Sequence, residues 1–248
     1  MVVTAPVTPQ PDTESAGHAA PRPRNDSWWP LAEGVSPGLG VITDSLRARI
    51  ASMRTSDTDP IRVDFLTHGD LDLPGRVGLT FAPGKKDYEF DWDRDLDADL
   101  RRLREHYSVD CLISLLEAPE YAALHVAALP ERAATYGLTR RSFPIRDVDA
   151  PPARSMRRFL ALIHCVIEDV RAGRTVVVYC RGGMGRSGLV AASCLVACGH
   201  GATEAIRRVR LARPGAVEVA TQERWVEMVA QATRGKRRQI SLAKPRSA

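Results

Sequence analysis

The segment at residues 175–188, TVVVYCRGGMGRSG, constrains the fold of this chain more than any other. Its β-branched and aromatic residues predict a buried strand that ends at Cys180. Three glycines follow, and Arg186 and Ser187 begin an apolar helix. A buried strand that turns into a helix through glycines is typical of proteins in which helices cover a mostly parallel sheet.

The same loop has the residue types of an anion-binding site. Its glycines let successive backbone N–H groups point inward, and the helix N-terminus adds N–H groups and the positive end of its dipole. Arg186 offers a planar, two-pronged donor that suits phosphate oxygens. A cysteine at the centre of such a loop is favoured as a thiolate, and Ser187 can donate a hydrogen bond to its sulfur when it leaves. The residues that we expect around a bound phosphate are Arg181, Gly182, Gly183, Met184, Gly185 and Arg186.

The rest of the chain alternates between helical and strand patterns from residue 95 onward. Apolar spacing and short apolar runs predict the following elements. The helices are expected at 96–107, 159–173, 186–198, 202–212 and 219–233, with a helix-prone stretch near 117–137 that Pro130 breaks; the strands are expected at 109–116, 138–145 and 175–179. Before them we expect a helix at 43–54 and strands at 61–66 and 77–81. The sequence therefore predicts an α/β fold, a mainly parallel central sheet flanked by helices.

The two ends of the chain differ from the middle in composition. Residues 1–27 are rich in proline, threonine and serine and cannot bury enough apolar area to become ordered, so we expect a disordered tail. The net charge is +5, but six basic residues and no acidic ones lie from Arg234 onward, and five minus six leaves −1 for residues 1–233. We therefore expect one domain at 28–233, no nucleic-acid binding, and a disordered basic tail at 234–248 that is a candidate contact for an acidic partner.

The overall composition limits the class of protein. Apolar residues make up 44% of the chain and charged residues 26%, which is enough for a sizeable core. No apolar run approaches the roughly 20 residues of a membrane span, and the N-terminus lacks a leader pattern. The five cysteines have no metal-ligand spacing. We expect a cytoplasmic protein with reduced thiols and without a metal or cofactor.

Three segments together resemble the cysteine-dependent protein tyrosine and dual-specificity phosphatases, and within them the cyclin-dependent kinase inhibitor 3 (kinase-associated phosphatase) branch. They are GLTFAPGKK at 78–86, FPIRD at 143–147, and the loop at 180–187. Arg213 and the PGAV that follows it, with Gln222, also fit the closing element of the family. The resemblance covers residues 77–232 and implies a protein tyrosine phosphatase-like fold with the cysteine loop at its centre.

The resemblance also implies an activity, hydrolysis of phosphomonoesters through a phosphocysteine intermediate. Phosphotyrosine, phosphoserine or phosphothreonine in proteins are the substrates it favours, and small phosphoesters remain open as an alternative. Cys180 would be the nucleophile and Asp147 the general acid. A leaving oxygen needs a proton, and Asp147 and Asp149 both lie in a proline-containing loop after a predicted strand. Asp149 is thus the second candidate for the acid.

The chain departs from the family pattern at two positions. Tyr179 stands where the family usually has a histidine that orients the loop, so activity is expected to be reduced. Glu218 stands where the family has a water-positioning glutamine, which leaves Gln222 as a candidate substitute.

Two other functions remain open at this point. The start of the loop, Tyr179 to Arg181, is also similar to single-domain rhodaneses, which transfer sulfur through a loop cysteine. A third reading is a degenerate phosphatase that binds phosphoproteins without turning them over. The loop has only Arg181 as an additional cation, so a highly charged phosphoinositide is not favoured as a substrate.

We assign no catalytic role to two lysines and to the four cysteines other than Cys180. For Lys85 and Lys86, which lie beside a glycine, we favour a solvated turn; the alternative is that they edge the active-site cleft and attract an acidic substrate. Of the remaining cysteines, Cys111 is interpreted as a strand core residue and a weaker candidate for a thiol that resolves oxidised Cys180. The helix cysteines, Cys165, Cys194 and Cys198, are interpreted as core residues.

Overall fold

The computed structural model describes residues 38–242, apart from the side chains of residues 38–43, 45 and 235–242. The tail predicted at 1–27 lies outside these residues. The chain divides into two compact units, residues 1–45 and 46–248. Helix α1 (Gly38–Ser52) crosses the boundary, and all other elements belong to the second unit.

A five-stranded sheet with the order β1-β2-β7-β5-β6 forms the centre of the second unit. Its strands are β1 (Asp64–Phe65), β2 (Arg76–Phe81), β5 (Cys111–Ser114), β6 (Thr139–Ser142) and β7 (Thr175–Cys180). All neighbours run parallel except β1, which lies antiparallel at the edge. The mainly parallel sheet predicted from the sequence is therefore confirmed; β1, β5 and β6 are shorter than the apolar runs indicated, and β2 and β7 match them within one residue. A separate two-stranded sheet joins β3 (Lys86–Asp87) to β4 (Trp92–Asp93).

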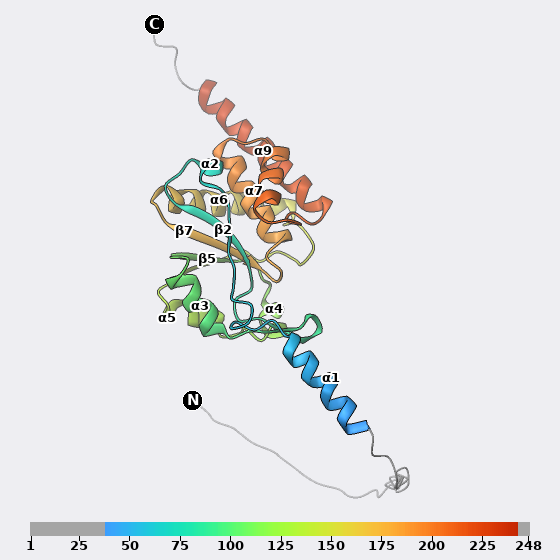
Figure 1. Ribbon diagram of the computed structural model, residues 1–248. Helices are drawn as coiled ribbons and strands as arrows, with labels where there is room; N and C mark the ends of the chain where they lie inside the picture. The colour runs from blue at the N-terminus through green and yellow to red at the C-terminus, as the bar shows by residue number, and fades with distance from the viewer. Residues whose placement is uncertain (1–37, 243–248) are drawn as a thin grey trace, which may run out of the picture. The chain divides into compact units, whose positions relative to one another are not determined.

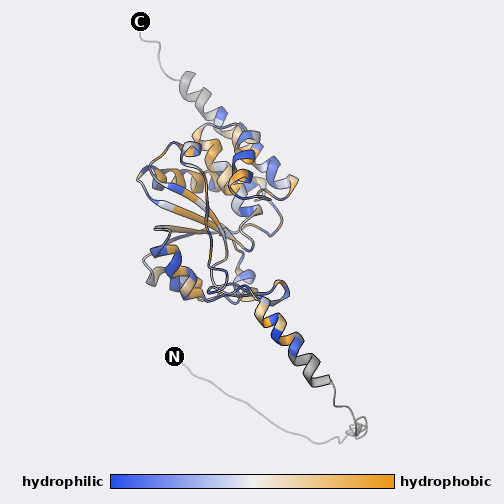
Figure 2. Cartoon of the chain, in the orientation of Figure 1, coloured by the Kyte–Doolittle hydropathy of each residue, from blue (hydrophilic) through white to orange (hydrophobic). Residues whose placement is uncertain are grey.

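Helices cover both faces of the sheet (Figure 1). One face carries α3 (Leu96–Glu105) and α5 (Leu129–Thr135), with α4 (Ala118–Ala123) between them in the chain; the other carries α6 (Met156–Arg171), α7 (Gly185–Cys198), α8 (Ala202–Ala212) and α9 (Ala220–Leu242). Three short helical turns complete the fold: α2 (His68–Leu71), η1 (Tyr88–Phe90) and η2 (Ala153–Ser155). Figure 2 shows apolar colours along the central strands and α7, and hydrophilic colours on much of α3.

The period of strand β7 divides the core into two layers. Val176, Val178 and Cys180 pack with the helices α6 to α9, whereas Val177 and Tyr179 pack on the opposite face with α3 and α5. This is the alternation expected of successive side chains in a strand. Because β7 is central and parallel to both neighbours, its last residue, Cys180, lies at the carboxyl edge of the sheet, where α/β proteins bind ligands.

Two helix boundaries differ from the predictions. Pro130 does not break a helix but lies in the first turn of α5, where its missing N–H costs nothing. Helix α9 continues past the expected end near residue 233 to Leu242, and residues 243–248 lie outside the described part of the chain. The domain limits at 28 and 233 stay predictions. Within residues 38–242, no helix is both long and apolar enough to cross a membrane.

Candidate active site

The loop after β7 surrounds the sulfur of Cys180. Cys180 is 3% exposed, and its Sγ accepts a hydrogen bond from the N–H of Gly183 at 3.2 Å. Gly183 has φ +72°, and a Cβ there would overlap the backbone of Thr80 and lie 2.6 Å from the nitrogen of Phe81. The close approach of the loop to β2 therefore requires a glycine, and it turns this N–H toward the sulfur.

Arg186 lies in the first turn of α7 and is 1% exposed. Its guanidinium binds Glu120 through two hydrogen bonds of 2.6 and 2.7 Å and forms an ion pair with Asp147 at 2.8 Å. It also donates to the carbonyl of Ile145 at 2.9 Å. Its Nε is buried without a partner among the described residues, which leaves a donor for a ligand. Sequence reasoning missed Glu120, which lies on α4, 66 residues before Arg186.

Ser187, the next residue of α7, is fully buried. Its hydroxyl also has no partner among the described residues. A buried polar group without a partner is uncommon and favours a role in which the partner is a ligand or a transient charge. The structure thus places two unused donors, Arg186 Nε and Ser187 Oγ, at the helix end that follows the Cys180 loop.

The structure separates the two candidate acids. Asp147 lines the same cavity as Cys180, and its side chain is 44% exposed. The carboxylate of Asp149 instead accepts the N–H of Ala150 at 2.8 Å, and Asp149 is absent from the cavity lining. Val148 between them has φ +55°, a strained conformation for a β-branched residue. This strained residue gives the two carboxylates different surroundings.

Gln222 holds the acid loop to the start of α9. It is fully buried, and its Nε2 donates to the carbonyl of Asp149 at 3.1 Å while its Oε1 accepts the N–H of Glu218 at 2.9 Å. Both ends of the amide are therefore bonded to backbone. Glu218 lines the cavity, and its carboxylate lies where a Cβ on Gly185 would overlap it. Of the two candidate accessory residues, Glu218 is the one with a charged group in the cavity.

Tyr179 lies on the other face of the sheet from Cys180, fully buried with the α3 and α5 layer. Burial raises the pKa of its hydroxyl well above the usual range, so the side chain is neutral. It therefore contributes no charge to the site.

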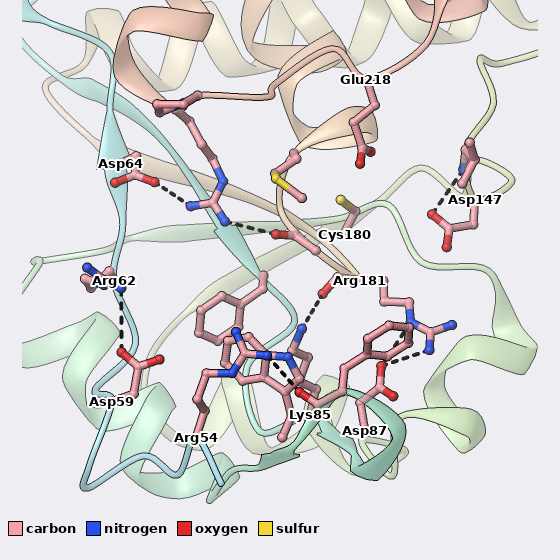
Figure 3. A pocket seen from close by; sticks show the side chains of 18 residues that line it. Arg54, Asp59, Arg62, Asp64, Lys85, Asp87, Asp147, Cys180, Arg181 and Glu218 are labelled. Atoms are coloured by element: carbon pink, nitrogen blue, oxygen red, sulfur yellow. Dashed lines mark hydrogen bonds and ion pairs between the residues drawn. The ribbon is translucent and has the colours of Figure 1, made fainter. Parts of the chain in front are cut away.

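A cavity of about 720 Å³ opens above Cys180 (Figure 3). The loop supplies Arg181, Gly182 and Met184 to its lining, and the acid loop supplies Asp147 and Val148. The cations that reach it from other elements are Arg54, Arg62, Lys85 and Arg213. Arg181 is the only additional cation of the loop itself, but the tertiary structure brings further cations to the cavity from segments distant in the sequence.

The favoured interpretation of Lys85 as part of a solvated turn is wrong, and the alternative, that it edges the cleft, is the one that the structure supports. It is 4% exposed, and its Nζ lies 4.0 Å from the centre of the Trp92 ring. Its neighbour Lys86 is half-exposed and pairs with Asp93 at 2.6 Å. The turn between β2 and β3 directs Lys85 into the cavity and Lys86 away from its lining. Gly84 and the aromatic residues Phe81 and Trp92 were the sequence signals that could have indicated this.

The four other cysteines differ in burial. Cys111 is a buried strand residue, but β5 pairs it with Val176, four residues before Cys180, about 13 Å along the strand. A disulfide needs Cα atoms within about 7 Å, so Cys111 cannot resolve oxidised Cys180. Cys165 is exposed on α6, so its interpretation as a core residue is wrong. Cys194 is buried as expected, and Cys198 is half-buried.

Comparisons with known proteins agree with this geometry. Residues 92–200 match the model of a family described as "Polymorphic toxin system, DSP-PTPase phosphatase". Tyrosine-protein phosphatase CDC14 of Candida albicans is 32% identical over 81 residues, which are 32% of this chain and 14% of that protein. The chain thus matches a small part of that curated relative. The matched family region contains Glu120, Asp147 and the whole Cys180 loop.

Solved structures show the same fold. Kinase associated phosphatase with its catalytic-site cysteine substituted by serine superposes with a TM-score of 0.64 at 21% identity, covering 70% of this chain and 96% of that one. Tk-PTP in its active form has a TM-score of 0.53 at 27% identity, covering 68% and 96%. PTPMT1 has a TM-score of 0.56 at 16% identity, covering 72% and 99%.

Proposed function

We propose that the chain is a cysteine-dependent protein tyrosine or dual-specificity phosphatase, and that it hydrolyses phosphomonoesters, first of all phosphotyrosine, phosphoserine or phosphothreonine in proteins. One observation carries the proposal: Cys180, the unused Nε of Arg186 and the carboxylate of Asp147 meet at one end of the sheet. They supply a nucleophile, an anion-binding donor and a proton carrier.

The reaction would proceed in two steps. The Cys180 thiolate attacks phosphorus, the phosphorus–oxygen ester bond breaks, and Asp147 gives a proton to the leaving oxygen. Water then attacks the phosphocysteine, Asp147 takes its proton, and the thiolate leaves with a hydrogen bond from Ser187. The loop amides and Arg186 hold the three other phosphate oxygens. Because Asp147 is paired with Arg186 in this structure, proton delivery requires the acid loop to shift toward the substrate.

Two alternatives have less support. A rhodanese-like sulfurtransferase has no role for Asp147 or for its pairing with Arg186. A phosphoprotein-binding module without turnover has no need of a buried thiol at the centre of the loop. Assay of the protein with an aryl phosphate, and separately with thiosulfate plus cyanide, distinguishes the three.

The proposed mechanism predicts metal-independent turnover. We expect hydrolysis of p-nitrophenyl phosphate to continue in excess chelator, because the loop amides and Arg186 provide the donors that the phosphate needs. Cys180→Ser should abolish turnover while it leaves the fold intact. Steady-state rates and circular dichroism measure both. Activity that chelator removes and only a divalent metal restores would contradict the mechanism.

The free thiols support one further proposal, a cytoplasmic location. Cys111, Cys165, Cys180 and Cys194 form no disulfide in the structure, and reduced thiols are usual in a reducing compartment.

A further inference from the structure

Carboxylates neutralise most of the cations around Cys180. Arg186 faces both Glu120 and Asp147, so this group of three has an excess of negative charge. Arg181 pairs with Asp87 at 2.8 Å, and Arg213 pairs with Asp64. The positive charge that a thiolate and a phosphate need must therefore come from elsewhere in the cavity or from the backbone.

Lys85 is a buried cation of this cavity that has no carboxylate at ion-pair distance among the described residues. Its Nζ donates to the carbonyl of Arg181 at 3.2 Å and lies over the rings of Trp92 at 4.0 Å and Phe81 at 5.1 Å. An ammonium has three donors, and the structure shows one of them in use. Lys85 and Cys180 both line the cavity (Figure 3).

A buried ammonium is costly unless negative charge compensates it. The Arg181 carbonyl and the two rings offset part of this cost. Arg54 is the other cation of the lining without a carboxylate partner among the described residues. It is exposed, and it does not compensate the charge of Lys85, because two positive charges repel each other. An anion in the cavity would supply the missing compensation. The two anions that the site is built to contain are the Cys180 thiolate and the phosphate.

We propose that Lys85 supplies a buried, uncompensated positive charge to this site, which stabilises the Cys180 thiolate and the anion bound above it. That the anion is a substrate phosphate rests on the proposed function; the effect on the thiolate does not. Lys85 also positions the loop, because it holds the carbonyl of Arg181, the residue after the nucleophile.

The proposal has a consequence for pH dependence. Burial lowers the pKa of Lys85 to about 8; Asp87 opposes the shift, Arg54 and Arg181 add to it, and Cys180 opposes it. A group with a lowered pKa of this kind carries its charge below that pH and loses it above. The stabilisation of the thiolate should therefore be present at neutral pH and fade as the pH rises through about 8.

The test measures the local charge at Cys180 without any need for turnover. Iodoacetate is an anion and iodoacetamide is neutral, so the ratio of their alkylation rates reports the electrostatic potential at the sulfur. The rates are followed at Cys180 itself by mass spectrometry, because Cys165 is also exposed. We expect Lys85→Met to lower this ratio by about three- to tenfold at pH 7. Inorganic phosphate should protect Cys180 less well in this variant.

Two further variants make the test specific. Lys85→Arg restores the charge and, because arginine does not titrate in this range, should keep the iodoacetate preference above pH 8 where the wild type loses it. Lys86→Met is the matched control, since Lys86 belongs to the same turn but pairs with Asp93 and should leave the ratio unchanged.

Three outcomes would overturn the inference. The first is a folded Lys85→Met variant with the wild-type ratio of alkylation rates. The second is a Lys86→Met variant that lowers the ratio as much as Lys85→Met does. The third applies if Lys85→Met does not fold: a Lys85→Arg variant whose iodoacetate preference falls above pH 8 as it does in the wild type. The ratio of alkylation rates could change as expected in a protein that has no phosphatase activity. That result would refute the proposed function and support the role of Lys85.

Discussion

At the scale of single residues, the proposed chemistry depends on which carboxylate of the acid loop reaches the cavity. Asp147 does so, paired with Arg186, and Asp149 turns back to its own backbone. The strained Val148 between them makes this separation possible. In the proposed mechanism Asp147 therefore has two tasks, to pair with Arg186 before substrate binds and to carry the proton afterwards. The second task requires the pair to break.

We predict that Asp147→Ala slows turnover by about 10²–10⁴-fold on a phenyl phosphate with a poor leaving group, the usual size of general acid catalysis. The loss should be much smaller on p-nitrophenyl phosphate, whose leaving group needs no proton. Asp149→Ala is the control and should keep near wild-type rates on both substrates, because its side chain bonds only the N–H of Ala150. If Asp149→Ala shows the leaving-group dependence instead, the assignment of the acid is wrong.

At the scale of elements, the site depends on the close contact of the β7–α7 loop with β2. The two strands pair from Arg76 with Thr175 to Phe81 with Cys180, so the end of β2 lies beside the loop. Gly183 must be a glycine because its backbone lies against β2. Gly182 has no such contact, since a Cβ there would meet only Met184, at an ordinary 3.6 Å. Two adjacent glycines thus have different structural requirements.

The difference predicts different effects of the same substitution. Gly183→Ala should reduce turnover by about 10²-fold or more, since it forces the loop away from β2 and displaces the N–H that binds the Cys180 sulfur, a loss comparable to removal of one oxyanion donor. Gly182→Ala should stay within a few-fold of the wild type. Steady-state rates and protection of Cys180 by phosphate measure both. Equal effects of the two substitutions would contradict the loop geometry.

At the scale of the whole molecule, the residues that build the site and its core lie between Arg54 and Ala230. The last turns of α9 that contact the core contain Trp225, Val226, Val229 and Ala230. The proline-rich N-terminal segment and the basic C-terminal segment contain none of the residues proposed for catalysis. The chemistry should thus reside in the domain between them.

We predict that deletion of residues 1–27, or of the chain after Arg234, leaves kcat/KM for p-nitrophenyl phosphate within about twofold of the full chain. Activity and the thermal unfolding midpoint of each truncated protein check this. A truncated protein that unfolds at the same temperature as the full chain but has lost turnover would show that an end segment takes part in catalysis.

The local parts of this protein follow from patterns of neighbouring residues. The strand, the glycines, Arg186 and the helix after them are neighbours along the chain, and their geometry depends on spacing and backbone preference alone. Tyr179 and Cys180 lie on opposite faces of the sheet, because successive side chains of a strand alternate between its two faces. The mainly parallel sheet followed from the alternation of helices and strands.

The charges that surround the cysteine depend on the tertiary structure. Glu120 meets Arg186 across 66 positions, and Lys85 meets the Arg181 carbonyl across 96. Such contacts depend on strand order and on the direction of a turn, which no local pattern encodes. Burial then changes their strength, because a charge removed from water interacts with its neighbours far more strongly than a solvated one. For this reason Lys85, which looks like a surface lysine in the sequence, becomes a functional charge in the fold.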